Sequence, residues 1–313
     1  MSAIVFPGIG PTPFADLARF LVVHPVARRF VAEADRALGY SLIDRCRETE
    51  ARSDQGAFPE PMRLAFLVSY LALAEYAVTE HEVEPVACAG ASFGGIPAAV
   101  RSGALPFSEA VTMAAAWGRR VDAYFAREHG DIVAQSFARV PPERLAEIRA
   151  ELDARGEWNE VACQVDHDFH MLSVRETAVE WLQRRLRAAG GLPLYVMRPP
   201  MHSTLFGALR EEIAAEVAAG VAFSDPDVVV VSDHDGSLVR TADGVRTMLL
   251  DAVTRPVRWP AVAETLTGLG VERVYVPGQD ALWGRVDVMT QAFEVVAVRP
   301  DTAMRPRRRS AIA

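Results

Sequence analysis

The pentapeptide Gly90-Ala91-Ser92-Phe93-Gly94 follows directly on the apolar run Val86-Ala87-Cys88-Ala89. Such a run is typical of a buried strand, and the pentapeptide has the GxSxG pattern of a strand–turn–helix nucleophile elbow. Because glycine has no Cβ, the chain can turn sharply there and leave the Ser92 hydroxyl at the start of a helix, where backbone N–H groups are unpaired. The pattern therefore predicts a serine nucleophile in an α/β fold.

Strands and helices alternate on both sides of this elbow. Short apolar runs predict strands, and longer stretches with helical spacing of apolar residues predict helices. The expected strands are residues 4–6, 86–89, 228–231 and 274–276, and the expected helices are residues 61–80, 106–128, 206–220 and 244–253. This alternation is typical of a parallel sheet covered by helices.

The segment between residues 130 and 197 has a different rhythm. Its expected elements are strand 132–134, helix 142–154, strands 161–165 and 169–174, helix 176–189 and strand 193–196. This order is that of a ferredoxin-like unit. The sequence therefore predicts a large α/β hydrolase-like parallel-sheet domain, residues 1–129 and 198–313, with an inserted ferredoxin-like small subdomain, residues 130–197.

Composition excludes several classes of protein. The chain has 313 residues and a formal net charge of -8, whereas the surface of a nucleic-acid-binding protein should be basic. Cys46, Cys88 and Cys163 lie far apart in apolar or helical contexts, which favours buried thiols over disulfides or a metal site. The N-terminus leads straight into a strand, and no uncharged apolar run is long enough to span a bilayer. We expect a cytoplasmic monomer that contacts neither nucleic acid nor membrane.

A serine nucleophile needs a base, because its hydroxyl is hardly ionised at neutral pH. His202 is the candidate, since it follows Pro199 and Pro200 in a loop that two prolines would hold stiffly; a surface-loop histidine is the alternative. The triplets at residues 166–168 and 233–235 each read Asp-His-Asp. Adjacent strand residues point to opposite faces, so these triplets do not converge on one metal ion. We expect turn or surface roles for them and no metal site.

Four segments together resemble the motifs of a known family, in its order and spacing. They are Phe6-Pro7-Gly8-Ile9-Gly10, Gly90-Ala91-Ser92-Phe93-Gly94-Gly95, Met201-His202-Ser203-Thr204-Leu205-Phe206 and Arg255-Pro256-Val257-Arg258-Trp259. They resemble the FPGQG, GHSxGE, xHSxxM and RPVRW segments of the malonyl-CoA:acyl-carrier-protein transacylases, a family that includes the acyltransferase domains of polyketide synthases. The resemblance covers most of the chain.

The resemblance implies a mechanism. Ser92 would form an acyl-enzyme, His202 would act as general base, and the backbone N–H groups of Ile9 and Phe93 would form the oxyanion hole. A backbone carbonyl, nearest Ala252 or Val253, would orient the histidine. No metal or redox cofactor is implied, because the acyl group travels on the phosphopantetheine of coenzyme A or of an acyl carrier protein.

Departures from the family pattern concern the substrate. Relatives that load malonyl groups have an arginine on the helix after the elbow, and ungapped counting from Ser92 places Trp117 there. An indole cannot form the bidentate pair that a guanidinium gives a carboxylate. Ala91 and the Pro200–Met201 pair also differ from the malonyl type, as does Gly95 in place of the usual glutamate. The alternative is a shifted alignment that brings Arg119 or Arg120 into the carboxylate site.

The resemblance therefore implies a discrete, trans-acting acyltransferase of polyketide-type antibiotic biosynthesis. It would move a carboxylate-free acyl group (aminoacyl, dipeptidyl or fatty acyl) from a coenzyme A or carrier-protein thioester to an acyl carrier protein. An editing acyl-thioester hydrolase and a malonyl-CoA transacylase stay as alternatives, while Ser92 and His202 argue against a non-catalytic binding module. Basic residues that could dock an acidic carrier protein are Arg119 and Arg120, the cluster Arg184, Arg185 and Arg187, and the tail arginines Arg305, Arg307, Arg308 and Arg309.

Overall fold

The larger part of the molecule is built on a six-stranded sheet in the order β11-β10-β1-β2-β7-β8. The structure is a computed structural model that describes residues 1–10, 12–50, 59–278 and 282–305. Neighbouring strands of this sheet run parallel, except that β8 is antiparallel to β7. The strands are β1 (Ser2–Phe6), β2 (Pro85–Gly90), β7 (Val229–Val231), β8 (Leu238–Val239), β10 (Arg273–Pro277) and β11 (Glu294–Val298).

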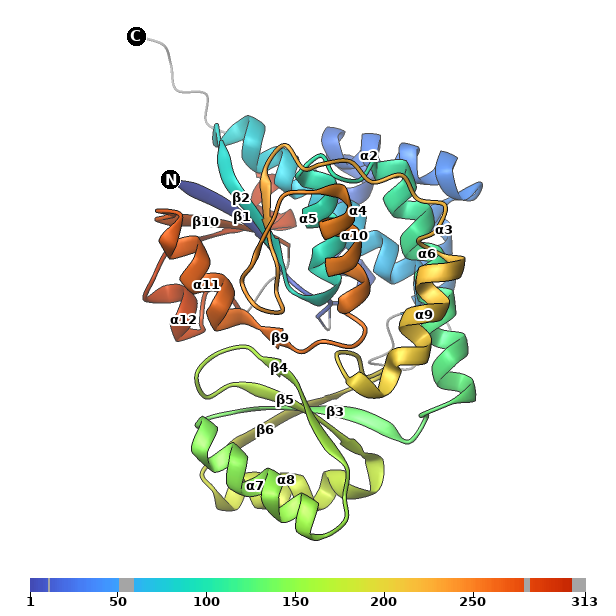
Figure 1. The fold of residues 1–313 in the computed structure, drawn as a ribbon. Helices are drawn as coiled ribbons and strands as arrows, with labels where there is room; N and C mark the ends of the chain where they lie inside the picture. The colour runs from blue at the N-terminus through green and yellow to red at the C-terminus, as the bar shows by residue number, and fades with distance from the viewer. Residues whose placement is uncertain (11, 51–58, 279–281, 306–313) are drawn as a thin grey trace.

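Helices cover both faces of this sheet (Figure 1). Successive side chains of β1 point to opposite faces, so Ile4 and Phe6 enter one core cluster while Ala3 and Val5 enter the other. The first cluster is formed mainly with α1 (Phe14–Val23), α2 (Pro25–Leu38), α3 (Leu42–Glu50), α4 (Glu60–Glu80), α5 (Gly95–Arg101), α6 (Phe107–Arg127) and α10 (Ala242–Asp251). The second lies under α11 (Trp259–Gly268) and α12 (Asp287–Thr290), and the described chain ends on α13 (Pro300–Ala303).

A second sheet lies below the first in Figure 1 and has the order β6-β3-β5-β4-β9. Its four antiparallel strands are β3 (Ile132–Ala138), β4 (Asn159–Gln164), β5 (His170–Arg175) and β6 (Leu192–Met197). The helices α7 (Pro142–Ala154) and α8 (Val179–Ala188) pack on one face around Phe137, Leu172 and Leu182. The chain then returns to the larger part through α9 (Gly207–Glu216).

The predicted fold class is confirmed, including the strand–helix–strand–strand–helix–strand order of the smaller unit. The smaller sheet has one strand that the sequence did not indicate. The two-residue strand β9 (Val257–Arg258) comes from the late part of the chain and pairs in parallel with β4 at Cys163 and Gln164. A strand of two residues is too short to give a periodic pattern.

Helix α4 is long and apolar enough, by length and composition alone, to cross a membrane. However, 72% of that stretch is buried inside the described fold. Leu67 and Leu71 lie in the same core cluster as Phe6 of the central strand. The apolar character of α4 is therefore that of a core helix.

The three cysteines are free and buried, as the sequence predicts. Burial raises the pKa of each thiol to about 12, so none is a thiolate at neutral pH. Thiols in such surroundings are chemically inert. Cys46, Cys88 and Cys163 therefore serve the packing of the core.

Candidate active site

The predicted elbow forms where β2 ends. Ser92 starts a single 3₁₀ turn (Ser92–Gly94) that continues into α5, and its backbone is left-handed, with φ of 54°. A Cβ on Gly90 would lie 1.9 Å from the Gly94 carbonyl oxygen, and one on Gly94 would lie 2.5 Å from the Phe6 carbonyl oxygen. Both positions therefore require glycine, and the turn leaves the Ser92 side chain partly exposed.

His202 lies opposite this serine, in the loop between β6 and α9. Its Nε2 is 2.8 Å from Ser92 Oγ, and its Nδ1 is 3.2 Å from the carbonyl oxygen of Arg255. A carbonyl can only accept, so Nδ1 carries the proton and Nε2 presents its lone pair to the serine hydroxyl. The ring is 5% exposed, so the surface-loop alternative is wrong.

The carbonyl that orients the histidine differs from the expected one. The sequence pointed to Ala252 or Val253, whereas the Nδ1 partner is Arg255. The Val253 carbonyl instead accepts the backbone N–H groups of His202, at 3.0 Å, and Ser203, at 3.3 Å. The segment 253–255 thus holds both the backbone and the ring of His202. A sequence motif alone does not tell which of its carbonyls contacts the backbone and which contacts the ring.

The electrostatics of the site favour a neutral imidazole. Burial, and then the neighbouring His234, lower the pKa of His202 to about 4. At neutral pH the ring is therefore deprotonated at Nε2, which is the state that can accept a proton from Ser92.

The segment after β1 packs against the elbow. The Ala91 N–H donates to the Phe6 carbonyl at 3.1 Å, and the Tyr70 hydroxyl donates to the Gly8 carbonyl at 3.0 Å. These bonds hold the turn that carries Ile9 beside the nucleophile. The Ser92 N–H is already used, because it donates to the Asp233 carboxylate at 2.7 Å. The Ser92 N–H is therefore not available to an oxyanion, and the role of the Ile9 and Phe93 N–H groups stays a prediction.

The structure brings two of the predicted substrate-binding residues together. Trp117 of α6 and Met201, next to His202, pack against one apolar cluster that includes Phe206 and Leu209. Pro200 is buried beside Met201, and Ala91, 7% exposed, precedes the nucleophile. The last turns of α6, Ile132 and residues 198–200 also line a cavity of about 400 Å³. Trp117 and Met201, the second of which is next to His202 in the chain, therefore add apolar surface. The cavity also has charged side chains in its lining, Asp122 and Arg198.

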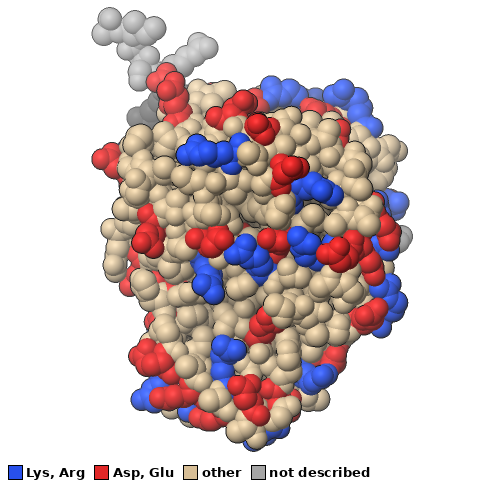
Figure 2. Space-filling view, viewed as in Figure 1, with Lys and Arg blue, Asp and Glu red and all other residues tan. Residues whose placement is uncertain are grey.

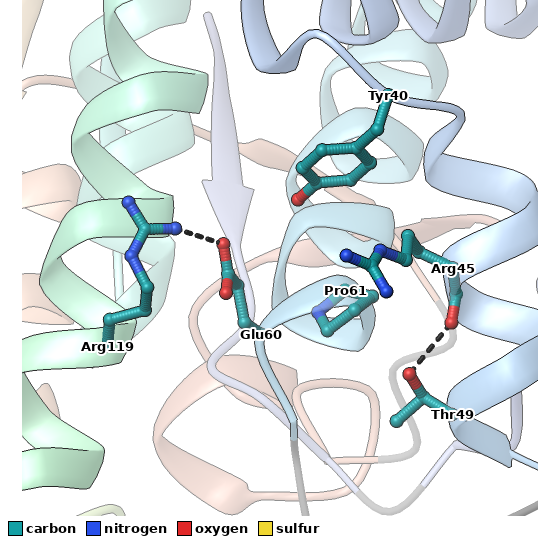
Figure 3. A pocket seen from close by; sticks show the side chains of 6 residues that line it. All are labelled: Tyr40, Arg45, Thr49, Glu60, Pro61 and Arg119. Atoms are coloured by element: carbon teal, nitrogen blue, oxygen red, sulfur yellow. Dashed lines mark hydrogen bonds and ion pairs between the residues drawn. The ribbon is translucent and has the colours of Figure 1, made fainter.

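The arginines proposed as carboxylate partners are engaged elsewhere. Arg119 lies 2.5 Å from Glu60, at the rim of a pocket of about 430 Å³ that Tyr40 and Arg45 also line (Figure 3). Arg120 pairs with two glutamates of α9, Glu212 and Glu216. Arg119, two positions after Trp117, lies on another face of α6, whereas Arg120, three positions after it, lies on a neighbouring part of the same face and is held by its glutamate partners.

The other basic candidates are also mostly paired. Arg184 pairs with Glu180, and Arg185 pairs with Glu151 at 2.6 Å, while Arg187 is exposed. Arg305 pairs with Asp301, and Arg307, Arg308 and Arg309 lie outside the described residues. On the face that Figure 2 shows, basic and acidic side chains are interspersed. The described arginines therefore form no large basic patch on that face.

Among the residues that the structure describes, no group of three or more His, Cys, Asp or Glu side chains converges as metal ligands would, at the two Asp-His-Asp triplets or elsewhere. Asp233 and His234 lie in a turn, as expected, but three members of the triplets are buried and not at the surface. Asp166, Asp233 and His234 are 6%, 4% and 2% exposed. Asp166 accepts the backbone N–H of Asp287 at 2.6 Å, and Asp233 accepts that of Ser92. Buried carboxylates need such donors, which local sequence does not reveal.

Comparisons with known proteins agree with this geometry. A family model described as the VinK acyltransferase small domain matches residues 136–197. The malonyl CoA-acyl carrier protein transacylase of Escherichia coli K12 is 28% identical over 287 residues, covering 88% of each chain. The polyketide biosynthesis protein ThaF of Burkholderia thailandensis is 28% identical over 283 residues, which are 87% of this chain and 23% of that protein.

Solved structures show the same fold. A malonyl-transacylase, solved with its type II polyketide synthase acyl-carrier protein and titled PlMCAT:AntF, has a TM-score of 0.82 and 25% identity, covering 95% of both chains. An acyl carrier protein S-malonyltransferase of Vibrio cholerae has a TM-score of 0.81 and 24% identity, covering 95% of this chain.

The fold and the serine–histidine pair define this chain as an acyltransferase. In sequence and fold the chain is similar to malonyl CoA-acyl carrier protein transacylases and to a polyketide biosynthesis protein.

Proposed function

We propose that this protein transfers an acyl group from a thioester to the phosphopantetheine thiol of an acyl carrier protein, through an acyl-enzyme on Ser92. The single observation that carries the proposal is the 2.8 Å contact between Ser92 Oγ and a histidine whose other nitrogen is held by a carbonyl. The relatives' names, which include acyl carrier protein as substrate or partner, support the choice of acceptor.

The first half-reaction forms the acyl-enzyme. His202 Nε2 takes the proton of the Ser92 hydroxyl while Oγ bonds to the thioester carbonyl carbon. The negative charge on the carbonyl oxygen is stabilised by the N–H groups of Ile9 and Phe93. When the intermediate collapses, the carbon–sulfur bond breaks and the leaving thiolate takes the proton from His202.

The second half-reaction reverses these roles. His202 takes the proton of the carrier protein's thiol, and the sulfur bonds to the acyl carbon. The bond to Ser92 Oγ then breaks, and the serine oxygen regains its proton from His202. No redox step or metal is needed, so we expect catalysis without a cofactor. We also expect the protein to act as a cytoplasmic monomer.

The transferred group, in this proposal, lacks a free carboxylate. Ungapped counting from Ser92 places Trp117 where the family has its arginine, and the next two basic residues of α6 are paired with glutamates of this chain. Ala91, Pro200 and Met201 add apolar surface. Burying an unpaired carboxylate here would cost several kcal/mol. Aminoacyl, dipeptidyl and fatty acyl groups avoid this cost, and a polyketide-type pathway would use them.

A malonyl group is the second candidate, because the relatives' names specify malonyl transfer. One basic side chain could serve it. Arg63 of α4 is 9% exposed. Its Nε has no hydrogen-bond partner among the described residues. This nitrogen packs against Gly118 of α6, where an added Cβ would lie 3.2 Å from it. Arg63 also pairs with Asp122, so its charge is already partly neutralised.

A panel of thioesters separates the two candidates. We expect intact-mass measurement to show Ser92 acylated by a carboxylate-free thioester at least about a hundredfold faster than by malonyl-CoA, since each 1.4 kcal/mol is about tenfold in rate. Trp117→Arg should recover part of the malonyl reaction, and Trp117→Phe, the apolar control, should not. Efficient malonyl transfer by the parent that Arg63→Met removes would favour the second candidate.

A further inference from the structure

The turn that follows β7 reaches the nucleophile. Parallel strands β2 and β7 are neighbours, so their carboxyl ends meet at one edge of the sheet, and the elbow and the turn 232–237 lie there together. Asp233 of this turn is 4% exposed, and its Oδ2 accepts the Ser92 N–H at 2.7 Å. The contact spans 141 positions of sequence, so tertiary structure alone creates it.

His234 lies next to the Asp233 carboxylate without a hydrogen bond to it. Its Nε2 is 3.1 Å from the Met248 carbonyl oxygen, so Nε2 carries a proton, and Nδ1 lies 3.3 Å from Asp233 Oδ1. Burial raises the pKa of Asp233, and the neighbouring His234 opposes that rise. In either protonation state Asp233 keeps an oxygen lone pair for the Ser92 N–H.

The same turn also supports the histidine side of the site. Asp235 Oδ2 lies 2.8 Å from Arg255 Nη2, and the Arg255 carbonyl accepts from His202 Nδ1. In addition, the Arg258 N–H donates to the Asp233 carbonyl at 2.7 Å. One short turn therefore contacts both the nucleophile and the segment whose carbonyl accepts from His202.

We infer that Asp233 is a positioning residue for the nucleophile. Ser92 has a left-handed backbone, which residues other than glycine adopt only when their surroundings enforce it. Asp233 enforces it by accepting the Ser92 N–H, which directs Oγ towards His202 and leaves the N–H of Phe93 for the oxyanion. This inference rests on the role proposed above for Ser92.

The test compares four variants with the parent. For each protein we measure the rate at which Ser92 is modified, first by a fluorophosphonate probe and separately by a carboxylate-free acyl thioester. Asp233→Ala removes the acceptor and should slow modification roughly ten- to a hundredfold, with an unchanged KM for the thioester. Asp233→Asn keeps an acceptor oxygen and should stay within about fivefold of the parent. Asp233→Ser, whose hydroxyl is too short to reach the amide, should behave like alanine and replaces it if the alanine variant does not fold.

Asp166→Ala is the matched control, because Asp166 is also a buried carboxylate that accepts backbone N–H groups, those of Asp287 and Val288, far from the nucleophile in sequence. It should lower Tm without changing the rate of the folded protein. The inference is overturned if folded Asp233→Ala or Asp233→Ser reacts within twofold of the parent, or if Asp233→Asn is as slow as they are. If the parent itself takes no label on Ser92, the proposed function fails as well, so the two failures are distinguishable.

Discussion

The nucleophile and its histidine have the same backbone conformation but are held in different ways. Ser92 has φ of 54° and His202 has φ of 66°, both in the left-handed region. The Ser92 N–H is held by a side chain, Asp233, whereas the His202 N–H and ring are held by the main-chain carbonyls of Val253 and Arg255. Main-chain acceptors persist through substitution and side-chain acceptors do not. The serine side of the site is therefore the more sensitive to mutation of its support.

The largest expected effect comes from the nucleophile itself. Ser92→Ala should abolish acyl-enzyme formation, because no hydroxyl remains to bond to the thioester carbon. The elbow serine is partly exposed, so its loss makes no core cavity and Tm should hardly change. Intact-mass measurement after incubation with acyl thioesters checks this. Acylation of another residue at the parent's rate would show that Ser92 is not the nucleophile.

The loss of the base should have the next largest effect. His202→Ala should slow acylation by about two to four orders of magnitude, the usual contribution of a general base. Stopped-flow acylation of the variant and the parent measures the difference. A rate within about threefold of the parent would remove His202 from the mechanism.

The pH dependence of the parent tests the same assignment. Because burial and His234 lower the pKa of His202 to about 4, the base is neutral above that value and protonated below it. The acylation rate should therefore stay level from about pH 8 to about pH 5 and fall as the pH decreases through the pKa. A fall centred near the ordinary histidine value would show that the ring is solvated during the reaction.

The support of the histidine should give the smallest effect. Arg255→Ala removes the ion pairs with Asp235 and Asp251 but keeps the carbonyl that accepts from His202 Nδ1. We expect acylation within about fivefold of the parent, in contrast to Asp233→Ala. If instead Arg255→Ala is the slower of the two, the difference between side-chain and main-chain support does not hold.

Residues whose role depends on local pattern were predictable from the sequence. The two glycines of the elbow mark a turn that sterics require, so the pattern of residues 90–94 is enough to place Ser92 at the nucleophile position. His202 was identified because its segment resembles a family motif at the right distance from the elbow. The ferredoxin-like unit followed from the order of its periodic segments.

Residues whose role depends on tertiary contacts could not be predicted from the sequence. Asp233 looked like a turn residue, although its position just after a buried strand next to the elbow strand was a usable signal, since parallel strands end at one edge. The engagement of Arg119 and Arg120 depends on glutamates of α4 and α9 that are distant in sequence. Nothing local distinguishes a paired arginine from a free one.

Strand β9 joins the two sheets at one point beside the serine–histidine pair. It bonds to β4 of the smaller sheet, while its Arg258 N–H bonds to the Asp233 carbonyl at the edge of the larger one. A rotation of the smaller sheet would therefore pivot about β9, and atoms near a pivot move least. In such a rotation the helices α7 and α8 would move furthest, because they lie on the face of that sheet away from the larger part (Figure 1). The Ser92–His202 pair, which lies beside β9, would therefore keep its separation while the smaller sheet turns.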